Sequence, residues 1–188
     1  MNEVQLKALE VKIAQLLSQR KRVIVGIDGC CAAGKTTLAY KLSGKFDCNV
    51  FHMDDFFLRP EQRTAERFAE VGGNVDYERF HDEVTVPLLK GESFSYRPFD
   101  CRTMKLKAPV EVKPKALNII EGTYSLHPHN AEAFDLSVFV GVEEALQRER
   151  ILKRPEQLHE RFFKLWIPME HRYFEKLRSE HEFDMIIE

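Results

Sequence analysis

The stretch that decides the fold reads Arg22-Val-Ile-Val-Gly-Ile-Asp-Gly-Cys-Cys-Ala-Ala-Gly-Lys-Thr-Thr37. Its first part is a short β-branched run, which is typical of a buried strand. Its second part matches G-x-x-x-x-G-K-[ST] at every fixed position, and a helical pattern continues over 36–43. A strand, a glycine-rich turn and a helix in this order direct several backbone N–H groups at one point. Such a concavity at a helix N-terminus binds phosphate groups.

The fixed residues of this motif each have a role in binding a nucleotide. The glycines allow the tight turn, Lys35 brings a mobile positive charge to the outer phosphates, and Thr36 offers a hydroxyl to magnesium. We therefore predict ATP and Mg2+ as ligands. Cys30 and Cys31 are interpreted as small loop residues rather than redox groups, because neither has an evident resolving partner. The predicted nucleotide-binding residues are Gly29, Cys30, Cys31, Ala32, Ala33, Gly34, Lys35, Thr36 and Thr37.

Composition narrows the class of protein. The chain has 188 residues, so we expect one domain over 1–188. Lys plus Arg total 28 and Asp plus Glu total 30, and this near-neutral balance argues against a general nucleic-acid binder. There is no apolar run long enough for a membrane span, and residues 1–10 lack the apolar core of a secretory signal. The four cysteines form no C-x-x-C pair. These features predict a reduced, cytoplasmic protein without membrane or nucleic-acid partners.

Short apolar runs alternate with helical patterns along the rest of the chain, which predicts βαβ units. The predicted fold class is α/β, a P-loop NTPase fold with a parallel five-stranded sheet flanked by helices. Residues 56–112 are predicted to be a small hairpin and helical insertion that binds an acceptor. It includes a helix over 77–89, with Pro87 awkward near its end. The predicted strands are 22–28, 49–54, 116–120, 136–142 and 183–187, and the helices outside the insertion are 2–20, 36–43, 143–153 and 160–179.

Acidic residues stand at the ends of two predicted strands. Asp54 and Asp55 close the second strand, and Glu121 follows the third. In open parallel sheets, ligands lie beyond the carboxyl ends of the strands. A carboxylate there could take a proton from an incoming hydroxyl or hold magnesium. Asp54 and Asp55 should point to opposite faces if the strand persists, so only one would serve. A solvated turn residue or a helix cap is the alternative for each.

Two further groups allow two interpretations each. Asp76 could bind an acceptor hydroxyl, or it could cap a helix that begins at Tyr77. Tyr96 and Arg102 belong to the cluster Tyr-Arg-Pro-Phe-Asp-Cys-Arg over 96–102, which could contact the acceptor or staple the hairpin.

A basic group lies on the helix predicted over 143–153 and at its exit. These side chains could form a solvated face with i,i+4 ion pairs. Alternatively, they could close over a nucleotide and stabilise charge on the transferred phosphoryl group. The residues are Arg148, Arg150, Lys153 and Arg154.

Three motifs together resemble the uridine kinase and nicotinamide riboside kinase group of P-loop kinases. They are Gly26-Ile-Asp-Gly-Cys-Cys-Ala-Ala-Gly-Lys-Thr-Thr37, His52-Met-Asp-Asp-Phe-Phe57 and Ile119-Ile-Glu-Gly122. The order of elements and the late Trp166-Ile-Pro-Met169 segment agree, and the resemblance spans 22–188. It implies a single kinase domain that transfers the γ-phosphoryl of Mg-ATP to a primary hydroxyl, above all the 5′-OH of a nucleoside.

The resemblance also implies roles for individual residues. Asp54 would be the general base, Glu121 would assist magnesium, and Asp76 would hold ribose hydroxyls. Lys35 would neutralise developing charge. A lid over about 148–162 would bring basic side chains to the nucleotide, and Arg150, Lys153 and Arg154 correspond loosely to its arginines.

Two departures leave the acceptor open. Uridine kinases carry a histidine where this chain has Cys101, and His-Pro after the ribose Asp where it has Tyr77-Glu78. Nicotinamide riboside, pantothenate or a sugar are therefore alternative acceptors. A nucleotide-switch NTPase that acts through a protein partner is another hypothesis, although the chain lacks Asn-Lys-x-Asp and Asp-x-x-Gly signatures. A non-catalytic nucleotide-binding module is disfavoured by the retained motif residues. The helix over 2–20 could pack within the chain or form the interface of a homo-oligomer.

Overall fold

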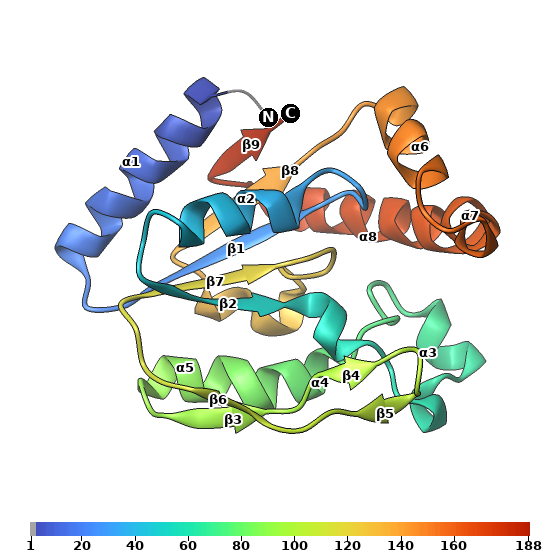
Figure 1. Cartoon of the computed structure of the whole chain (residues 1–188), viewed down its shortest axis with the longest axis horizontal. Helices are drawn as coiled ribbons and strands as arrows, with labels where there is room; N and C mark the ends of the chain where they lie inside the picture. Colours follow the sequence, from blue (N-terminus) through green and yellow to red (C-terminus); the bar gives the residue numbers. More distant parts are fainter. Residues whose placement is uncertain (1–2) are drawn as a thin grey trace.

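The computed structural model describes residues 3–188. Within them, five parallel strands form the central sheet in the order β2-β7-β1-β8-β9 (Figure 1). Val25 pairs with Ile119 on one side and with Leu136 on the other, so β1 lies at the centre. This arrangement confirms the predicted parallel five-stranded sheet flanked by helices. The strands are β1 (Val23–Gly29), β2 (Cys48–His52), β7 (Leu117–Glu121), β8 (Leu136–Val140) and β9 (Met185–Ile187).

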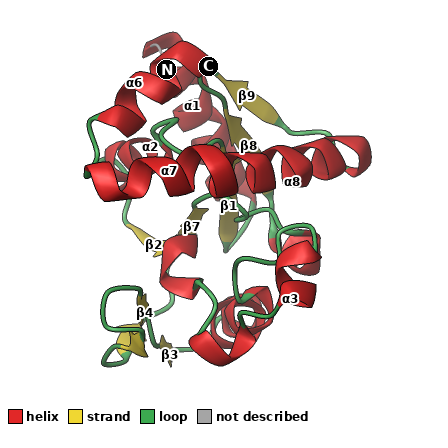
Figure 2. Ribbon diagram, turned by 90° about the vertical axis from the view of Figure 1, so that its right-hand side faces the viewer, coloured by secondary structure: helices red, strands yellow, loops and turns green. Residues whose placement is uncertain are grey.

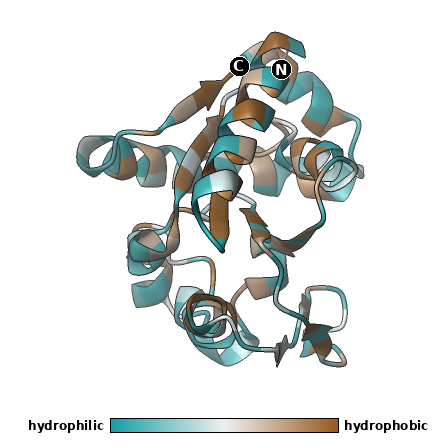
Figure 3. Ribbon diagram, turned by 90° about the vertical axis from the view of Figure 1, so that its left-hand side faces the viewer, coloured by the Kyte–Doolittle hydropathy of each residue, from teal (hydrophilic) through white to brown (hydrophobic). Residues whose placement is uncertain are grey.

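The central strand is buried along its whole length because helices cover both of its faces. Val23, Val25 and Ile27 point into one apolar cluster, whereas Ile24 points into another on the opposite face. Side chains alternate across a strand, so one sequence run supplies both cores. Figure 3 shows these strands as the most hydrophobic segments of the ribbon, between helices of mixed character.

Helices α1 (Glu3–Gln19) and α2 (Lys35–Ser43) cover the first face. Leu9 and Ile13 of α1 are fully buried, as are Leu38 and Leu42 of α2. The helix predicted over 2–20 is therefore confirmed over 3–19 and packs within the chain, while Asn2 lies outside the described residues. The structure contains no helix, among the residues it describes, with the length and apolar character needed to cross a membrane.

The second face is covered by α8 (Ile167–Glu180), whose Tyr173, Phe174 and Leu177 are buried. The chain reaches α8 from α6 (Glu144–Leu152) through η5 (Glu156–Leu158), α7 (His159–Arg161) and the π-helical turn η6 (Phe162–Trp166). The lid predicted over about 148–162 comprises the end of α6 and the first turns after it; below, the name lid is used for the connection between α6 and α8, residues 153–166. It lies at the far end of α8 from β9 (Figure 1).

The predicted insertion occupies residues 53–112 and lies beside the second face, apart from α1 and α2 (Figure 2). The helix predicted over 77–89 is present over 77–90, but its middle, 81–85, is π-helical. Pro87 accounts for this local widening, because its ring removes a donor and clashes with the preceding turn of a regular helix. The predicted hairpin is confirmed by antiparallel pairing of Phe94 with Val112.

The remaining elements of the insertion are short. Its helices are η1 (Met53–Phe56), η2 (Pro60–Gln62), α3 (Ala65–Ala69), α4 (Tyr77–Phe80), η3 (His81–Thr85) and α5 (Val86–Lys90). Its strands are β3 (Phe94–Tyr96), β4 (Phe99–Asp100), β5 (Lys105–Leu106) and β6 (Val110–Val112). Outside it, η4 (Pro128–Ala133) joins β7 to β8.

Candidate active site

The predicted phosphate-binding loop, residues 29–34, is called the phosphate loop below. It connects β1 to α2 at the carboxyl edge of the sheet. Gly29 has φ 142°, and a Cβ placed on it would lie 2.0 Å from the Val140 carbonyl oxygen. Gly34 caps α2 with φ 105°. Both positions therefore require glycine, the first for close backbone approach and the second for its backbone angle. The loop delivers its backbone to the N-terminus of α2, as the motif predicts.

Lys35 begins α2 and folds back over the loop. Its Nζ donates to the carbonyl oxygens of Gly29 at 2.7 Å and Cys30 at 2.8 Å, and to Thr123 Oγ1 at 3.0 Å. The side chain is 7 % exposed. A compact ammonium with rotatable donors can exchange such neutral acceptors for phosphate oxygens without moving its stem far.

A hydroxyl and a carboxylate meet next to Lys35. Thr36 Oγ1 lies 3.1 Å from Glu121 Oε1 and 3.2 Å from Oε2. His52 Nδ1 lies 2.5 Å from the same Oε1, and this hydrogen bond raises the pKa of His52. Magnesium commonly uses one or two protein oxygens and completes its shell with phosphate and water. The Thr36 and Glu121 oxygens therefore suit it, although no cluster of three or more metal-binding side chains occurs within 3–188.

Asp54 stands beside this pair, but not on a strand. Strand β2 ends at His52, and both Asp54 and Asp55 lie in the tight turn η1. The prediction that they point to opposite faces depended on a continuing strand, and the strand does not continue. The turn brings both carboxylates within electrostatic range of Glu121, which contributes to raising the pKa of each.

The Asp54 side chain is both accessible and enclosed. Its residue is exposed to solvent, yet surrounding protein desolvates the carboxylate and so raises its pKa, while Lys35 acts in the opposite direction. The accessible area decides whether a ligand can reach the group, and the protein around it decides its charge state. Lys35 and Glu121 both act on the charge of this carboxylate, which places Asp54 beside the phosphate loop. Asp54, Lys35, Thr36 and Glu121 are thus brought together.

Asp76 is buried, and the capping interpretation of it describes the structure. Its Oδ1 accepts the Arg79 N–H at 3.2 Å and so caps α4. Its Oδ2 makes no hydrogen bond but lies 3.4 Å from Arg79 Nε and 3.6 Å from Arg59 Nε. The Asp76 N–H donates to the Phe56 carbonyl at 2.7 Å, which ties it to the turn that carries Asp54. A role toward the acceptor stays a prediction.

The other two predicted acceptor residues differ in exposure. Tyr96 is 6 % exposed, and its ring packs 5.6 Å from that of Phe56 and 5.8 Å from that of Phe51. Burial, with the charge of Asp55, raises the pKa of Tyr96 to about 12. The Arg102 side chain is 92 % exposed and lies 3.9 Å from Asp100. The structure therefore leaves the Arg102 guanidinium in solvent.

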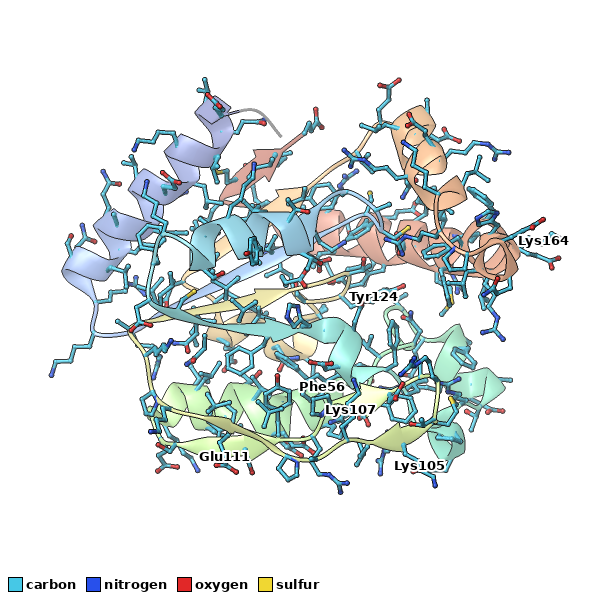
Figure 4. All side chains as sticks on the ribbon, in the orientation of Figure 1. Phe56, Lys105, Lys107, Glu111, Tyr124 and Lys164 are labelled. Atoms are coloured by element: carbon cyan, nitrogen blue, oxygen red, sulfur yellow. The ribbon has the colours of Figure 1, made fainter. Side chains whose placement is uncertain are left out.

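Only one of the four basic residues of the predicted lid group reaches the phosphate loop. Arg150 NH1 donates to the carbonyl oxygens of Ala32 at 2.8 Å and Ala33 at 3.3 Å. The others pack elsewhere: Arg148 lies over the Phe163 ring, Arg154 over the Phe162 ring, and Lys153 pairs with Glu149. Figure 4 shows another lysine of the lid, Lys164, projecting outward at the end of the molecule.

The sequence analysis missed two buried acids beside the loop. Asp28 accepts hydrogen bonds from the backbone N–H of Gly29, Tyr124 and Leu126 at 2.7 to 3.0 Å and from the Tyr173 hydroxyl at 2.7 Å. Glu170 Oε2 accepts from the Cys31 N–H at 2.9 Å. Both acids could have been noticed in the sequence by their apolar surroundings. Asp28 lies inside an apolar strand, and Glu170 lies on the apolar face of α8, three residues before Tyr173.

Asp28 also explains an unusual backbone angle. Tyr124 has φ 75°, which is strained for a residue with a side chain. Its N–H is fixed by Asp28, and its ring packs 4.7 Å from that of Tyr173. Figure 4 shows Tyr124 where the loop after β7 faces the insertion. Asp28 thus holds together the phosphate loop, the end of β7 and α8.

No family model matches the chain, and no curated protein matches it. Among solved structures, a possible uridine kinase from Bacillus stearothermophilus has a TM-score of 0.68 at 22 % identity, covering 96 % of this chain and all of that one. Shikimate kinase from Bacteroides thetaiotaomicron gives 0.43 at 13 % identity, covering 87 % and 85 %. Deoxyadenosine kinase from M. mycoides with bound dATP gives 0.40 at 16 % identity, covering 87 % and 90 %. The first comparison shows that this chain shares its fold with that possible uridine kinase.

Proposed function

We propose that this protein is an ATP-dependent small-molecule kinase. It transfers the γ-phosphoryl group of Mg-ATP to a primary hydroxyl, in the first place the 5′-OH of a nucleoside. The single observation that carries the proposal is the position of Asp54, an accessible carboxylate within electrostatic range of Lys35 and Glu121 at the phosphate loop. A phosphate-binding loop alone fits many NTPases, whereas an accessible acid beside it provides for an acceptor alcohol.

The residues of the sheet edge would hold the nucleotide. Backbone N–H groups of 29–37 bind the phosphate tail, and Lys35 exchanges its carbonyl partners for phosphate oxygens. Thr36 and Glu121 would hold Mg2+, which when bound neutralises charge on those oxygens. Arg150, already at the loop, adds positive charge on the lid side.

The chemical step then belongs to Asp54. Its carboxylate orients the acceptor hydroxyl and accepts its proton as the oxygen attacks the γ-phosphorus. The new O–P bond forms while the bond from the γ-phosphorus to the bridging oxygen breaks, which leaves ADP and a phosphomonoester. The raised pKa of Asp54 makes the carboxylate a better base than a fully solvated one.

The insertion would hold the acceptor. Asp76 and Tyr96 are the proposed acceptor contacts, and Arg59 and Arg79 fix the position of Asp76. Arg102, whose side chain is exposed, would contact the acceptor only if the β4–β5 turn closed onto it. Nicotinamide riboside, pantothenate and sugars are the alternatives to a nucleoside, since Cys101 replaces the histidine of uridine kinases. We also propose that the enzyme works in the cytoplasm. Its four cysteines, Cys30, Cys31, Cys48 and Cys101, are free thiols.

The test is an ADP-release assay with purified full-length protein and Mg-ATP, run against nucleosides, nicotinamide riboside, pantothenate and small sugars. We expect one acceptor to raise ADP release well above the rate with water alone, and mass spectrometry to find its phosphomonoester. Slow hydrolysis that no small acceptor stimulates, but that a protein does, would overturn the proposal in favour of a nucleotide switch.

A further inference from the structure

The phosphate loop is clamped by side chains from the two helices that flank the lid. At Cys31, the backbone N–H donates to Glu170 Oε2 of α8 at 2.9 Å, and the carbonyl oxygen accepts from Gln147 Nε2 of α6 at 3.0 Å. Glu170 is 5 % exposed and Gln147 6 %. The proposed function uses neither side chain. Both backbone polar groups of one loop residue, Cys31, are therefore held by the helices that precede and follow the lid.

The Glu170 carboxylate is a negatively charged group at a loop whose backbone is predicted to bind the negatively charged phosphates. The N–H that it accepts belongs to the loop whose amides should bind phosphate oxygens, and a carboxylate oxygen competes for the same kind of donor. Burial raises the pKa of Glu170, so its charge is costly there. The Cys31 N–H and the charge of Lys35 offset part of that cost, but no lysine, arginine or histidine among the described residues lies within ion-pair distance of Glu170.

The same helix is anchored one turn further along. The Tyr173 hydroxyl donates to Asp28 at 2.7 Å, and Tyr173 is 1 % exposed. On the other side of Glu170, Pro168 lies in the first turn of α8 and the π-helical turn over 162–166 precedes it. Proline and π-helical turns are common at points where a helix bends. At the end of α8 nearest the lid, Glu170 thus makes the hydrogen bond to the loop, whereas Tyr173 anchors the following turn to Asp28.

We infer that the Glu170 carboxylate occupies a position that a phosphate group would otherwise take. It accepts the Cys31 N–H while the loop is empty and releases this N–H when a triphosphate binds. Release frees the lid end of α8, so that nucleotide binding and lid position are coupled. The inference rests on the proposed function, because it requires the loop to bind a triphosphate. Because Glu170 competes with the nucleotide for the Cys31 N–H, it lowers the affinity of the loop for the nucleotide. The same competition links the position of the lid to the occupancy of the loop.

The chain carries a reporter for this motion. Trp166 is its one tryptophan, stands four residues before Glu170, and packs edge-on to Phe162 with ring centroids 4.6 Å apart. A movement of the lid end of α8 changes the surroundings of this ring. Intrinsic fluorescence of the full-length protein therefore follows the lid without any label.

The experiment titrates wild type, Glu170→Gln and Glu170→Ala with Mg-ATP and with inorganic tripolyphosphate, while Trp166 emission is recorded. Glu175→Gln is the matched control, because Glu175 is exposed on the same helix and loses the same charge. We expect Glu170→Gln to bind both ligands about tenfold more tightly than wild type and Glu175→Gln to match wild type. Free Glu170→Ala should already show part of the emission change that ligand causes in wild type.

The outcomes separate the two proposals. Equal or weaker binding by Glu170→Gln, or a wild-type emission that ligand does not change, overturns the role of Glu170 and leaves the kinase proposal standing. Failure of every variant, wild type included, to bind either ligand overturns both. Circular dichroism of Glu170→Ala checks its folding, and the conservative Glu170→Gln decides the matter if that variant does not fold.

Discussion

The proposed phosphate half of the site, at the edge of the sheet, and its proposed acceptor half, in the insertion, are built by different means. Lys35 and Thr36 begin α2 directly after the loop that follows β1, and Glu121 ends β7. Both strands are buried along their whole length, and the backbone ladder of the parallel sheet sets their positions. The insertion has strands of only two or three residues. Figure 2 shows it as a separate layer of short pieces below the sheet. Backbone pairing therefore positions the residues of the phosphate half, whereas side-chain contacts position those of the acceptor half.

Arginines replace backbone pairing in the insertion. Arg67 donates to the carbonyl oxygens of Gly73 at 3.1 Å and Val75 at 2.9 Å, binds both carboxylate oxygens of Glu78 at 2.6 Å, and stacks on Tyr77. A sheet register is set by the whole length of a strand, whereas this network depends on the side chain of one residue, Arg67. The difference implies that acceptor specificity can change while the phosphate loop stays as it is.

The largest effect should come from the one acid that serves both halves. Asp54→Asn removes the proton acceptor but keeps the size of the side chain, so turnover should fall about 1000-fold while the affinity for Mg-ATP stays near wild type. Asp55→Asn is the control, since it makes the same change one residue away. Equal losses in the two variants, measured by ADP release, would assign the effect to the turn η1 rather than to Asp54.

The next effect tests whether side chains hold the insertion. Arg67→Ala removes a guanidinium that is 14 % exposed and leaves Glu78 and two carbonyl groups without it. We expect a loss of about 3 kcal/mol in the free energy of unfolding, since several hydrogen bonds are lost while water can rehydrate the half-exposed Glu78; urea denaturation measures it. Lys153→Ala breaks an exposed pair with Glu149 and should cost under about 1 kcal/mol. Similar losses in both would mean that the Arg67 network adds nothing specific.

The sequence was informative where local pattern decides structure. The strand, glycine loop and helix over 22–43 are recognisable because their periods and spacing are local properties, and the five strands followed from the same rules. The sequence placed Asp54 near the end of the second strand but did not predict the turn η1 that carries it. A pattern of apolar residues does not show at which residue a strand ends. Asp28 and Glu170 escaped because their partners lie 96 to 145 residues and 139 residues away, respectively. Tyr96 and Arg102 stand in one cluster of the sequence, and only packing separates the buried ring from the exposed guanidinium.

A smaller effect is expected on the pH dependence of stability, from a ring contact between the two halves. His127, which follows β7, stacks on Tyr77 of the insertion with ring centroids 4.1 Å apart. Its Nδ1 accepts the His129 N–H at 3.2 Å, and burial lowers the pKa of His127 to about 4. The folded pKa thus lies below the unfolded value of 6.5, so the neutral ring stabilises the fold above pH 6.5. That contribution is lost as the pH falls from 6.5 toward 4 and amounts to about 3 kcal/mol at most.

The measurement is urea denaturation at several pH values between 7 and 4, with His127→Gln as the comparison. This variant cannot take up a proton at position 127, so the slope of its stability against pH should be shallower over that interval. Parallel slopes would show that other groups cause the acid sensitivity and that the stack between the halves does not depend on the charge of His127.

The smallest effect is expected at Arg102. Its guanidinium is almost fully exposed, whereas Arg97 in the same hairpin donates to the Lys107 carbonyl at 2.9 Å. Arg102→Ala should therefore leave both the KM for the acceptor found in the ADP-release assay and the urea midpoint close to wild type, and Arg97→Ala should lower the midpoint. A tenfold rise in acceptor KM for Arg102→Ala, with stability unchanged, would mean that the β4–β5 turn closes onto the acceptor. The two halves would then differ in mobility as well as in how they are built, because the sheet edge would be preformed and the hairpin would move to meet the ligand.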